Sequence, residues 1–262
     1  MNESGFSDYS ALDHPGVLAY IFHPRPSARP AGPNDILIEV AEDVHIGACF
    51  HLAGKAAPTI LFFHGNGEIV SDYDDLGPVY TRLGINFFVV DYRGYGWSTG
   101  SPSVSAMMAD SHRILDFVKQ WCREQGFTGP LTVMGRSLGS APAIELATAR
   151  PGEVETLIVE SGFASTESLL RVLGIDPAAR GIRMPAELDN REKIRQWTGP
   201  ALFIHGEQDQ LIPFSHGQTL FSACPSSEKK LVKIAHAGHN DIFLRGLEPY
   251  LSAVKSLVQP GT

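Results

Sequence analysis

The pattern of hydrophobic and polar positions changes near residue 58. Before that point, two short stretches at 36–40 and 44–52 are joined by an acidic turn at 41–43 and predict a pair of antiparallel strands. From residue 58, apolar runs without polar alternation are separated by longer amphipathic segments. Apolar runs of this kind are typical of strands buried on both faces of a parallel sheet. We therefore predict an α/β fold with an antiparallel N-terminal edge.

The apolar runs define six parallel strands at 59–63, 85–90, 131–134, 156–159, 201–204 and 230–234. Amphipathic segments predict helices near 70–83, 104–125, 138–149, 214–223 and 241–257. The sequence contains no internal repeat. Together these elements predict one domain over residues 1–262, a mostly parallel doubly wound sheet of about eight strands with helices on both faces.

Two segments lie outside this alternation of strands and helices. Residues 1–35 carry prolines that oppose regular structure, so we expect an N-terminal arm lying over the domain. Residues 162–199 contain short helical stretches, Pro177 and Pro185, and predict a small lid-like insertion over the carboxyl edge of the sheet.

The insertion carries two kinds of side chain with open roles. Its arginines predict a solvated face or, alternatively, contacts to an acidic substrate or a partner: Arg171, Arg180, Arg183, Arg191 and Arg195. Its large apolar residues suit helix packing or an acyl-chain pocket: Leu169, Leu170, Leu173 and Met184.

Composition narrows the class of protein. The net charge of −8 argues against binding to a nucleic acid backbone. The acidic first residues lack the positive charge and apolar core of a signal peptide, and no apolar run approaches the length of a membrane span. Cys49, Cys122 and Cys224 are few and widely spaced, which favours reduced cysteines in a cytoplasmic protein.

Polar residues follow the predicted parallel strands at their carboxyl ends, where open parallel sheets bind ligands. His64-Gly65-Asn66-Gly67 follows the first of these strands, and Gly135-Arg136-Ser137-Leu138-Gly139 follows the third. His205-Gly206 begins the loop after the fifth, and Gly238-His239 lies after the sixth. The histidines of these loops do not form the close ligand pairs of a zinc site, so we expect no metal.

The pattern Gly-x-Ser-x-Gly occurs twice, around Ser98 and around Ser137. Ser137 lies between a predicted strand and a predicted helix, which is the setting of a strained nucleophile whose negative charge is stabilised by the first turn of the helix. Ser98 is followed by Thr99-Gly100-Ser101-Pro102, which predicts a loop. We therefore predict that Ser137 is the nucleophile.

A serine nucleophile needs an imidazole to take its proton and a carboxylate to orient that imidazole. Asp209 and His239 lie in the loops after the last two predicted strands, in the order Ser, Asp, His. His236 is a competing base, and Glu160, at the end of a predicted strand, is a competing acid.

Other polar residues of these loops are interpreted as structural. His64 is expected to brace the loop that contains Asn66, and Asp91 and Arg93 are expected to form turns. Glu68 is expected to face solvent or to begin the helix that follows; if it pointed inward instead, it would oppose an anionic acyl substrate.

These motifs, taken in order, resemble the α/β-hydrolase superfamily, especially its small serine-hydrolase branch with a reduced lid; the matching segments include His64–Gly67, Asp91–Gly96, Gly135–Gly139, His205–Pro213 and Gly238-His239. The resemblance covers about residues 36–257. It implies a catalytic triad of Ser137, Asp209 and His239, and an oxyanion hole from the backbone N–H groups of Asn66 and Leu138. No cofactor is implied.

The expected function is hydrolysis of a carboxylic ester or thioester of a small acyl substrate through an acyl-enzyme. Two alternatives stay open: acyl transfer or amide cleavage with the same triad, and a non-catalytic binding protein with the same fold. The default expectation for the oligomeric state is a monomer or a weak homodimer.

Overall fold

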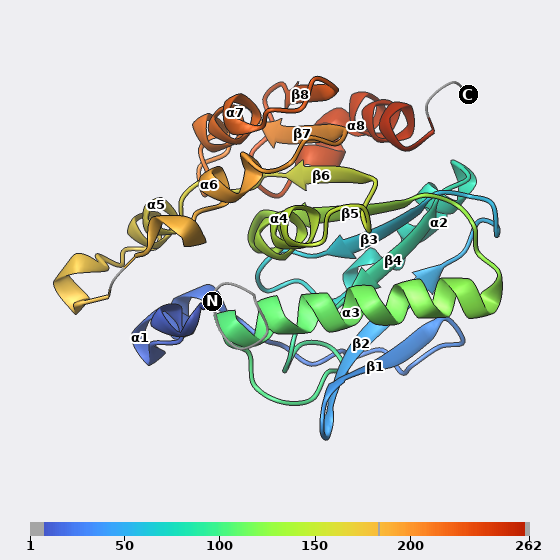
Figure 1. Ribbon diagram of the computed structural model, residues 1–262, viewed down its shortest axis with the longest axis horizontal. Coiled ribbons are helices and arrows are strands. Elements are labelled where there is room, and N and C mark those ends of the chain that lie inside the picture. The colour runs from blue at the N-terminus through green and yellow to red at the C-terminus, as the bar shows by residue number, and fades with distance from the viewer. Residues whose placement is uncertain (1–7, 183, 260–262) are drawn as a thin grey trace.

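The structure is a computed structural model that describes residues 8–182 and 184–259. Its centre is an eight-stranded sheet with the strand order β1-β2-β4-β3-β5-β6-β7-β8 (Figure 1). The strands are β1 Asp35–Ala41, β2 Val44–His51, β3 Thr59–Phe63, β4 Asn86–Val90, β5 Leu131–Arg136, β6 Thr156–Glu160, β7 Ala201–Gly206 and β8 Lys229–Ile234.

Strand directions match the sequence prediction. β1 pairs antiparallel with β2, and β2 antiparallel with β4, whereas every pair from β4 to β8 is parallel. The antiparallel strands form one edge of the sheet, as predicted. The predicted fold class, a mostly parallel sheet with an antiparallel N-terminal edge, is confirmed.

Helices pack on both faces of the sheet because alternate residues of each buried strand point to opposite faces. On β3, Leu61 and Phe63 join one hydrophobic core, and Ile60 and Phe62 join the other. The helices that contribute to the first core include α3 Val104–Gln125, α4 Ser140–Ala149 and α7 Phe214–Ala223; those of the second include α2 Gly77–Arg82 and α8 Ile242–Val258.

The N-terminal arm contains regular structure, so the prediction of an irregular arm is wrong. A 3₁₀ turn at Ser10–Leu12 precedes helix α1, Pro15–Ile21. Pro15 occupies the first helical position, where a backbone N–H is not needed, and the other prolines of the arm come after the helix. His14 caps the helix by accepting a hydrogen bond from the N–H of Gly16 at 3.1 Å.

Two predicted helices have irregular starts. The segment predicted at 70–83 is divided into a 3₁₀ turn, Val70–Tyr73, and the short helix α2. The segment predicted at 138–149 begins with a 3₁₀ turn, Ser137–Gly139, before α4. The helices predicted at 104–125 and 214–223 have the predicted bounds.

The segment 162–199 forms α5 Thr166–Val172, two 3₁₀ turns at Ala178–Arg180 and Ala186–Leu188, and α6 Asn190–Ile194. Together with α1, this segment lies at the carboxyl end of the parallel strands (Figure 1). Three of its arginines, Arg171, Arg191 and Arg195, are exposed and pair with acidic residues of the same segment. Arg183 lies outside the described residues.

A buried polar cluster links the arm and the insertion to α4. The hydroxyl of Tyr9 donates a hydrogen bond to Glu145 Oε2 at 2.6 Å, and Lys193 Nζ donates to the same oxygen at 2.7 Å. Burial lowers the pKa of Lys193 to about 7. Because Tyr9 belongs to the arm and Lys193 to α6, the cluster joins both segments to the helix that follows Ser137.

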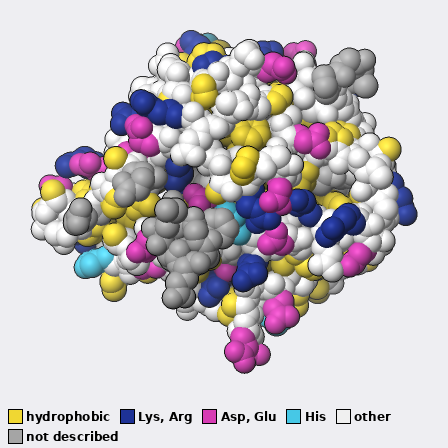
Figure 2. Space-filling view, viewed as in Figure 1, with side chains coloured by type: hydrophobic (Ala, Val, Ile, Leu, Met, Phe, Trp, Pro, Cys, Tyr) yellow, Lys and Arg dark blue, Asp and Glu magenta, His cyan; other side chains and the backbone are white. Residues whose placement is uncertain are grey.

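The visible surface is mixed in character. Figure 2 shows charged side chains of both signs interspersed with apolar ones. Among the described residues, no helix is both long enough and apolar enough to cross a membrane.

Candidate active site

The turn between β5 and α4 has the strained geometry of a nucleophile elbow. Ser137 has a φ of +52°, which is uncommon for a residue other than glycine. A Cβ atom on Gly135 would lie 2.0 Å from the carbonyl oxygen of Gly139, and one on Gly139 would lie 2.1 Å from that of Phe63. Both glycines are therefore required because backbone segments pack against them. Ser140 Oγ supports the turn with a hydrogen bond to the Ser137 carbonyl at 2.6 Å.

Ser137, His239 and Asp209 form a continuous line of hydrogen-bond contacts. His239 Nε2 lies 3.0 Å from Ser137 Oγ, and His239 Nδ1 lies 2.7 Å from Asp209 Oδ2. Asp209 lies in the loop after β7 and His239 in the loop after β8, so the topology brings three distant segments to one sheet edge. These are the distances needed to move a proton from a serine hydroxyl to an imidazole that a carboxylate orients.

The surroundings of Asp209 keep it ionised. Its side chain is 0% exposed. Burial raises the pKa of Asp209, but hydrogen bonds from His205 and His239 lower it by more, so the pKa lies well below its usual value. The N–H groups of Leu211 and Ile212 also donate to Oδ1, at 2.9 and 2.8 Å.

The competing residues make other contacts, although Glu160 and His239 line the same groove. His236 is exposed, and its backbone N–H donates to Glu207. Glu160 accepts a hydrogen bond from Tyr250 at 2.7 Å, and burial raises its pKa. Ser98 lies in a loop, where its Oγ accepts a hydrogen bond from the N–H of Gly47 at 2.9 Å.

A pocket of about 190 Å³ opens beside Ser137. Asn66 and Leu138, from which the sequence predicts the oxyanion hole, both line it together with Ser137 and His239. Its apolar wall comes from three parts of the chain and consists of Ile21, Leu169, Leu173, Leu211 and Ile212. The insertion therefore contributes to the pocket, although Leu170 points into the core.

A wider groove of about 890 Å³ adjoins the same site. It shares Asn66, Glu68, His239 and Asn240 with the smaller pocket. The opposite wall of the groove comes from α8 and includes Phe243, Leu244 and Leu247. The smaller pocket therefore has a larger open space beside it.

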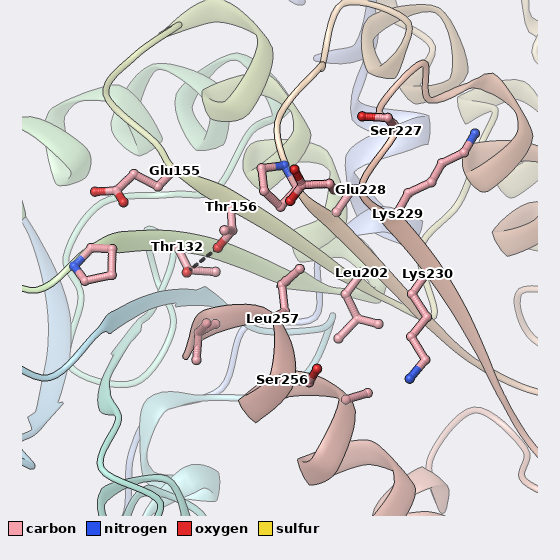
Figure 3. Close-up of a pocket in the computed structure, with 15 residues that line it drawn as sticks. Thr132, Glu155, Thr156, Leu202, Ser227, Glu228, Lys229, Lys230, Ser256 and Leu257 are labelled. Carbon is pink, nitrogen blue, oxygen red and sulfur yellow. Dashed lines mark hydrogen bonds between the residues drawn. The ribbon is translucent and has the colours of Figure 1, made fainter. Parts of the chain in front are cut away.

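A third pocket, drawn in Figure 3, lies at the amino ends of the parallel strands, away from Ser137. Its volume is about 480 Å³, and it is lined by residues at the amino ends of β5 to β8, among them Thr132 and Thr156, which form a hydrogen bond with each other. In parallel sheets the reactive loops lie at the carboxyl ends, so this pocket is separate from the candidate site.

The arm braces the loop that carries Asn66. The backbone N–H of His23 and the hydroxyl of Tyr95 both donate to Asn66 Oδ1, at 2.9 Å each. Arg25 Nε donates to the carbonyl of Gly67 at 2.8 Å. This contact could not be predicted from the sequence, because the residues of an expected irregular arm gave no signal for it.

Two further residues of the site were also missed. Glu68 does not face solvent or begin a helix: its Oε2 accepts hydrogen bonds from the N–H of Gly65 and from the hydroxyl of Tyr73, both at 2.6 Å. Its Oε1 accepts from Arg136 Nε at 2.8 Å. Arg136 is the second of these residues. The only signal in the sequence was that Glu68 and Arg136 are charged residues in the segments that follow predicted strands.

One group of described residues has the side chains to hold a metal. Ligand atoms of Cys49, His51 and Asp74 lie within 4.8 Å of one another. Arg29 already pairs with Asp74, and burial raises the pKa of the Cys49 thiol to about 12. Because a metal ligand must be the thiolate, we assign no metal function to this group.

The sheet topology and the elbow at the end of β5 define the α/β-hydrolase fold. A solved structure, Est1E from Butyrivibrio proteoclasticus, has this fold in common with the chain, with a TM-score of 0.70, 18% identity, and coverage of 85% of this chain and 96% of Est1E. The sequence model of the family described as serine aminopeptidase, S33, matches residues 54–181.

Two curated relatives are similar in sequence. Protein bem46 from Schizosaccharomyces pombe is 31% identical over 197 residues, which cover 72% of this chain and 64% of bem46. Alpha/beta hydrolase domain-containing protein 17C from Mus musculus is 34% identical over 225 residues, which cover 83% of this chain and 65% of the relative. The chain therefore spans slightly less than two thirds of these relatives. The family model, the relatives and the shared fold together support its place in the α/β-hydrolase superfamily.

Proposed function

We propose that the protein hydrolyses a carboxylic ester or thioester through an acyl-enzyme on Ser137. The observation that carries this proposal is the line of contacts from Ser137 Oγ to His239 Nε2 and from His239 Nδ1 to Asp209 Oδ2. Ser137 and His239 of this line are part of the wall of a pocket that also has apolar walls, which suits an acyl group.

In the proposed reaction, Ser137 Oγ attacks the substrate carbonyl while His239 Nε2 accepts the hydroxyl proton. The ionised Asp209 holds Nδ1 of His239 in its protonated form and stabilises the imidazolium. The N–H groups of Asn66 and Leu138 stabilise the oxyanion. His239 then gives the proton to the leaving alcohol or thiol, and a water molecule attacks the acyl-enzyme in the second half of the reaction.

Amide cleavage is the competing function, and the match to a serine aminopeptidase family model favours it. An aminopeptidase needs a group that recognises a free amino terminus. The carboxylate of Glu68 lines the pocket, but both of its oxygens already accept hydrogen bonds, from Arg136 on one side and from Gly65 and Tyr73 on the other. We therefore favour an ester or thioester.

A substrate panel tests the proposal. It contains p-nitrophenyl esters graded by acyl length, the matching thioesters, and aminoacyl p-nitroanilides, each with the natural protein and with Ser137→Ala. We expect turnover of esters or thioesters that Ser137→Ala loses. Turnover of the anilides alone would favour the aminopeptidase reaction, and turnover of no substrate, or equal turnover by Ser137→Ala, would contradict the proposal.

A further inference from the structure

Arg136 lies directly before Ser137 and takes no part in the proposed path of the proton. Its side chain is only 9% exposed, although it carries a charge. Its guanidinium donates to Glu68 Oε1 from Nε at 2.8 Å, to the carbonyl of His239 from Nη1 at 3.1 Å, and to Asn240 Oδ1 from Nη2 at 3.0 Å. One side chain on the elbow therefore contacts two other loops of the site.

The first of these loops is the one expected to provide an oxyanion donor. Glu68 Oε2 accepts the backbone N–H of Gly65, which directly precedes Asn66, at 2.6 Å. Glu68 thus joins Arg136 to the backbone next to Asn66. The second loop contains the proposed base, since Arg136 contacts the backbone carbonyl of His239 itself.

The charges around Arg136 make this arrangement stable. Burial alone lowers the pKa of Arg136, but the negative charges of Glu160 and Glu68 raise it by more, so the guanidinium stays charged. Burial alone raises the pKa of Glu68, but the charge of Arg136 and the hydrogen bonds from Tyr73 and Gly65 contribute to a net lowering. A planar guanidinium presents its donors in fixed directions, which the single ammonium of a lysine does not.

We propose that Arg136 is a positioning residue that holds the Asn66 loop and the His239 loop in register with Ser137. Each of the three loops contributes one part of the reaction: the nucleophile, the base and an oxyanion donor. Displacements of about 1 Å between such parts cost about 100-fold in rate. The effect on catalysis rests on the proposed function, whereas the effect on the two loops does not.

Amide hydrogen exchange tests the effect on the loops without any substrate. We expect residues 64–68 and 237–241 to exchange about tenfold faster in Arg136→Gln than in the natural protein. Glu68→Gln should accelerate exchange in 64–68 alone, because the contact of Arg136 with His239 remains. Wild-type exchange rates in both loops of a folded Arg136→Gln protein would overturn the proposal.

A matched control comes from Arg93, which also lies beside a strand end and donates from Nε and Nη2 to Asp110, both at 2.7 Å. Arg93→Gln removes a comparable ion pair without touching the two loops. We expect it to leave exchange at 64–68 and 237–241 unchanged. If it accelerates both loops as much as Arg136→Gln does, the effect is general destabilisation and the proposal is wrong.

Kinetics then test the effect on catalysis. We expect Arg136→Gln to lower kcat about 100-fold while KM changes by less than about threefold, since the alignment of reacting groups is lost and the apolar pocket is kept. Arg136→Lys should restore less than about a tenth of the activity, because one ammonium cannot contact both loops. Full recovery with lysine, or an unchanged kcat in Arg136→Gln, would contradict a positioning role.

Failure of the two proposals can be distinguished. If the natural protein turns over no ester and no thioester, the proposed function fails, and the exchange experiment still decides whether Arg136 orders the two loops. If the natural protein is active and the exchange rates of folded Arg136→Gln are unchanged, only the positioning proposal fails.

Discussion

The two Gly-x-Ser-x-Gly segments of this chain share a pattern but differ in every physical property that bears on catalysis. Ser137 follows a buried strand, has a φ of +52°, and has its Oγ 3.0 Å from an imidazole nitrogen. Ser98 lies in a loop, and its Oγ accepts a hydrogen bond from the backbone of Gly47. The first hydroxyl can give its proton to a base, whereas the second stabilises a loop.

Two histidines that each pair with an aspartate, His64 and His239, differ in the same way. His64 lies next to Asp91, at 3.1 Å, but its other ring nitrogen is 2.8 Å from the carbonyl of Gly65. Both nitrogens of His64 are therefore engaged with acceptors. His239 uses one nitrogen for Asp209 and presents the other to Ser137. A His–Asp pair supports catalysis only when one ring nitrogen remains for the nucleophile.

The largest effect should separate the two serines. We expect Ser137→Ala to lower kcat on the order of 10⁴-fold or more, because the nucleophile is lost. Ser98→Ala should keep kcat within about twofold, since it loses only a loop hydrogen bond. Steady-state ester hydrolysis measures both. Comparable losses of kcat in the two variants would contradict the assignment of Ser137, rather than Ser98, as the nucleophile.

A somewhat smaller difference in kcat is expected between variants of Asp209, the partner of His239, and of Asp91, the partner of His64. Asp209→Asn should lower kcat about 10³- to 10⁴-fold, because an amide cannot stabilise the imidazolium or hold its tautomer. Asp91→Asn should change kcat by less than about tenfold and instead lower the free energy of unfolding by about 1–3 kcal/mol, since the partner of His64 is altered. Steady-state kinetics and urea denaturation of both variants measure these effects. A greater loss of kcat in Asp91→Asn than in Asp209→Asn would contradict the assignment of Asp209 as the partner of the catalytic base.

Replacing the last glycine of each Gly-x-Ser-x-Gly pattern by alanine should lower the free energy of unfolding by different amounts. A Cβ on Gly139 would lie 2.1 Å from the carbonyl oxygen of Phe63, so we expect Gly139→Ala to lower the free energy of unfolding by about 3 kcal/mol or more. A Cβ on Gly100 would lie 3.4 Å from the nearest side-chain atom, and its φ is +76°. Gly100→Ala should therefore cost about 1–2 kcal/mol, from backbone strain alone. Equal urea midpoints for the two variants would show that the tight packing of the elbow is unimportant.

The smallest effect concerns pH. Because the pKa of Asp209 is lowered in the folded state, its ionisation stabilises the fold above the unfolded carboxyl pKa, about 3.9, and this contribution is lost as pH falls below that value. The difference in unfolding free energy between the natural protein and Asp209→Asn should therefore shrink by about 1 kcal/mol or more between pH 5 and pH 3. A difference that stays constant or grows over this range would contradict the lowered pKa.

The sheet could be predicted from the sequence because buried parallel strands are continuous apolar runs, as at β3 and β4. The side chains of Ser137, Asp209 and His239 could be predicted to meet because each follows a strand whose carboxyl end lies at the same end of the sheet. The order of the sequence motifs resembles the α/β-hydrolase superfamily, and this resemblance pointed to Asn66 and Leu138 as donors of the oxyanion hole.

Other features depend on contacts that no local pattern encodes. Helix α1 is short, and its Val17 and Ile21 are buried against the rest of the protein, so packing rather than propensity accounts for it. Arg136 and Glu68 are 68 positions apart and each alone resembles a solvated charge at a loop. Their pairing follows only once β3 and β5 lie side by side.

Labelling with a fluorophosphonate followed by peptide mapping shows directly whether Ser137 is the nucleophile. Trypsin separates the two serines, because it cuts after Arg113 and Arg136, which lie between them. We expect the phosphonyl group on the peptide that begins at Ser137, with labelling lost in Ser137→Ala and retained in Ser98→Ala. A phosphonyl group on the peptide that contains Ser98, or equal labelling of Ser137→Ala, would contradict the assignment of Ser137 as the nucleophile.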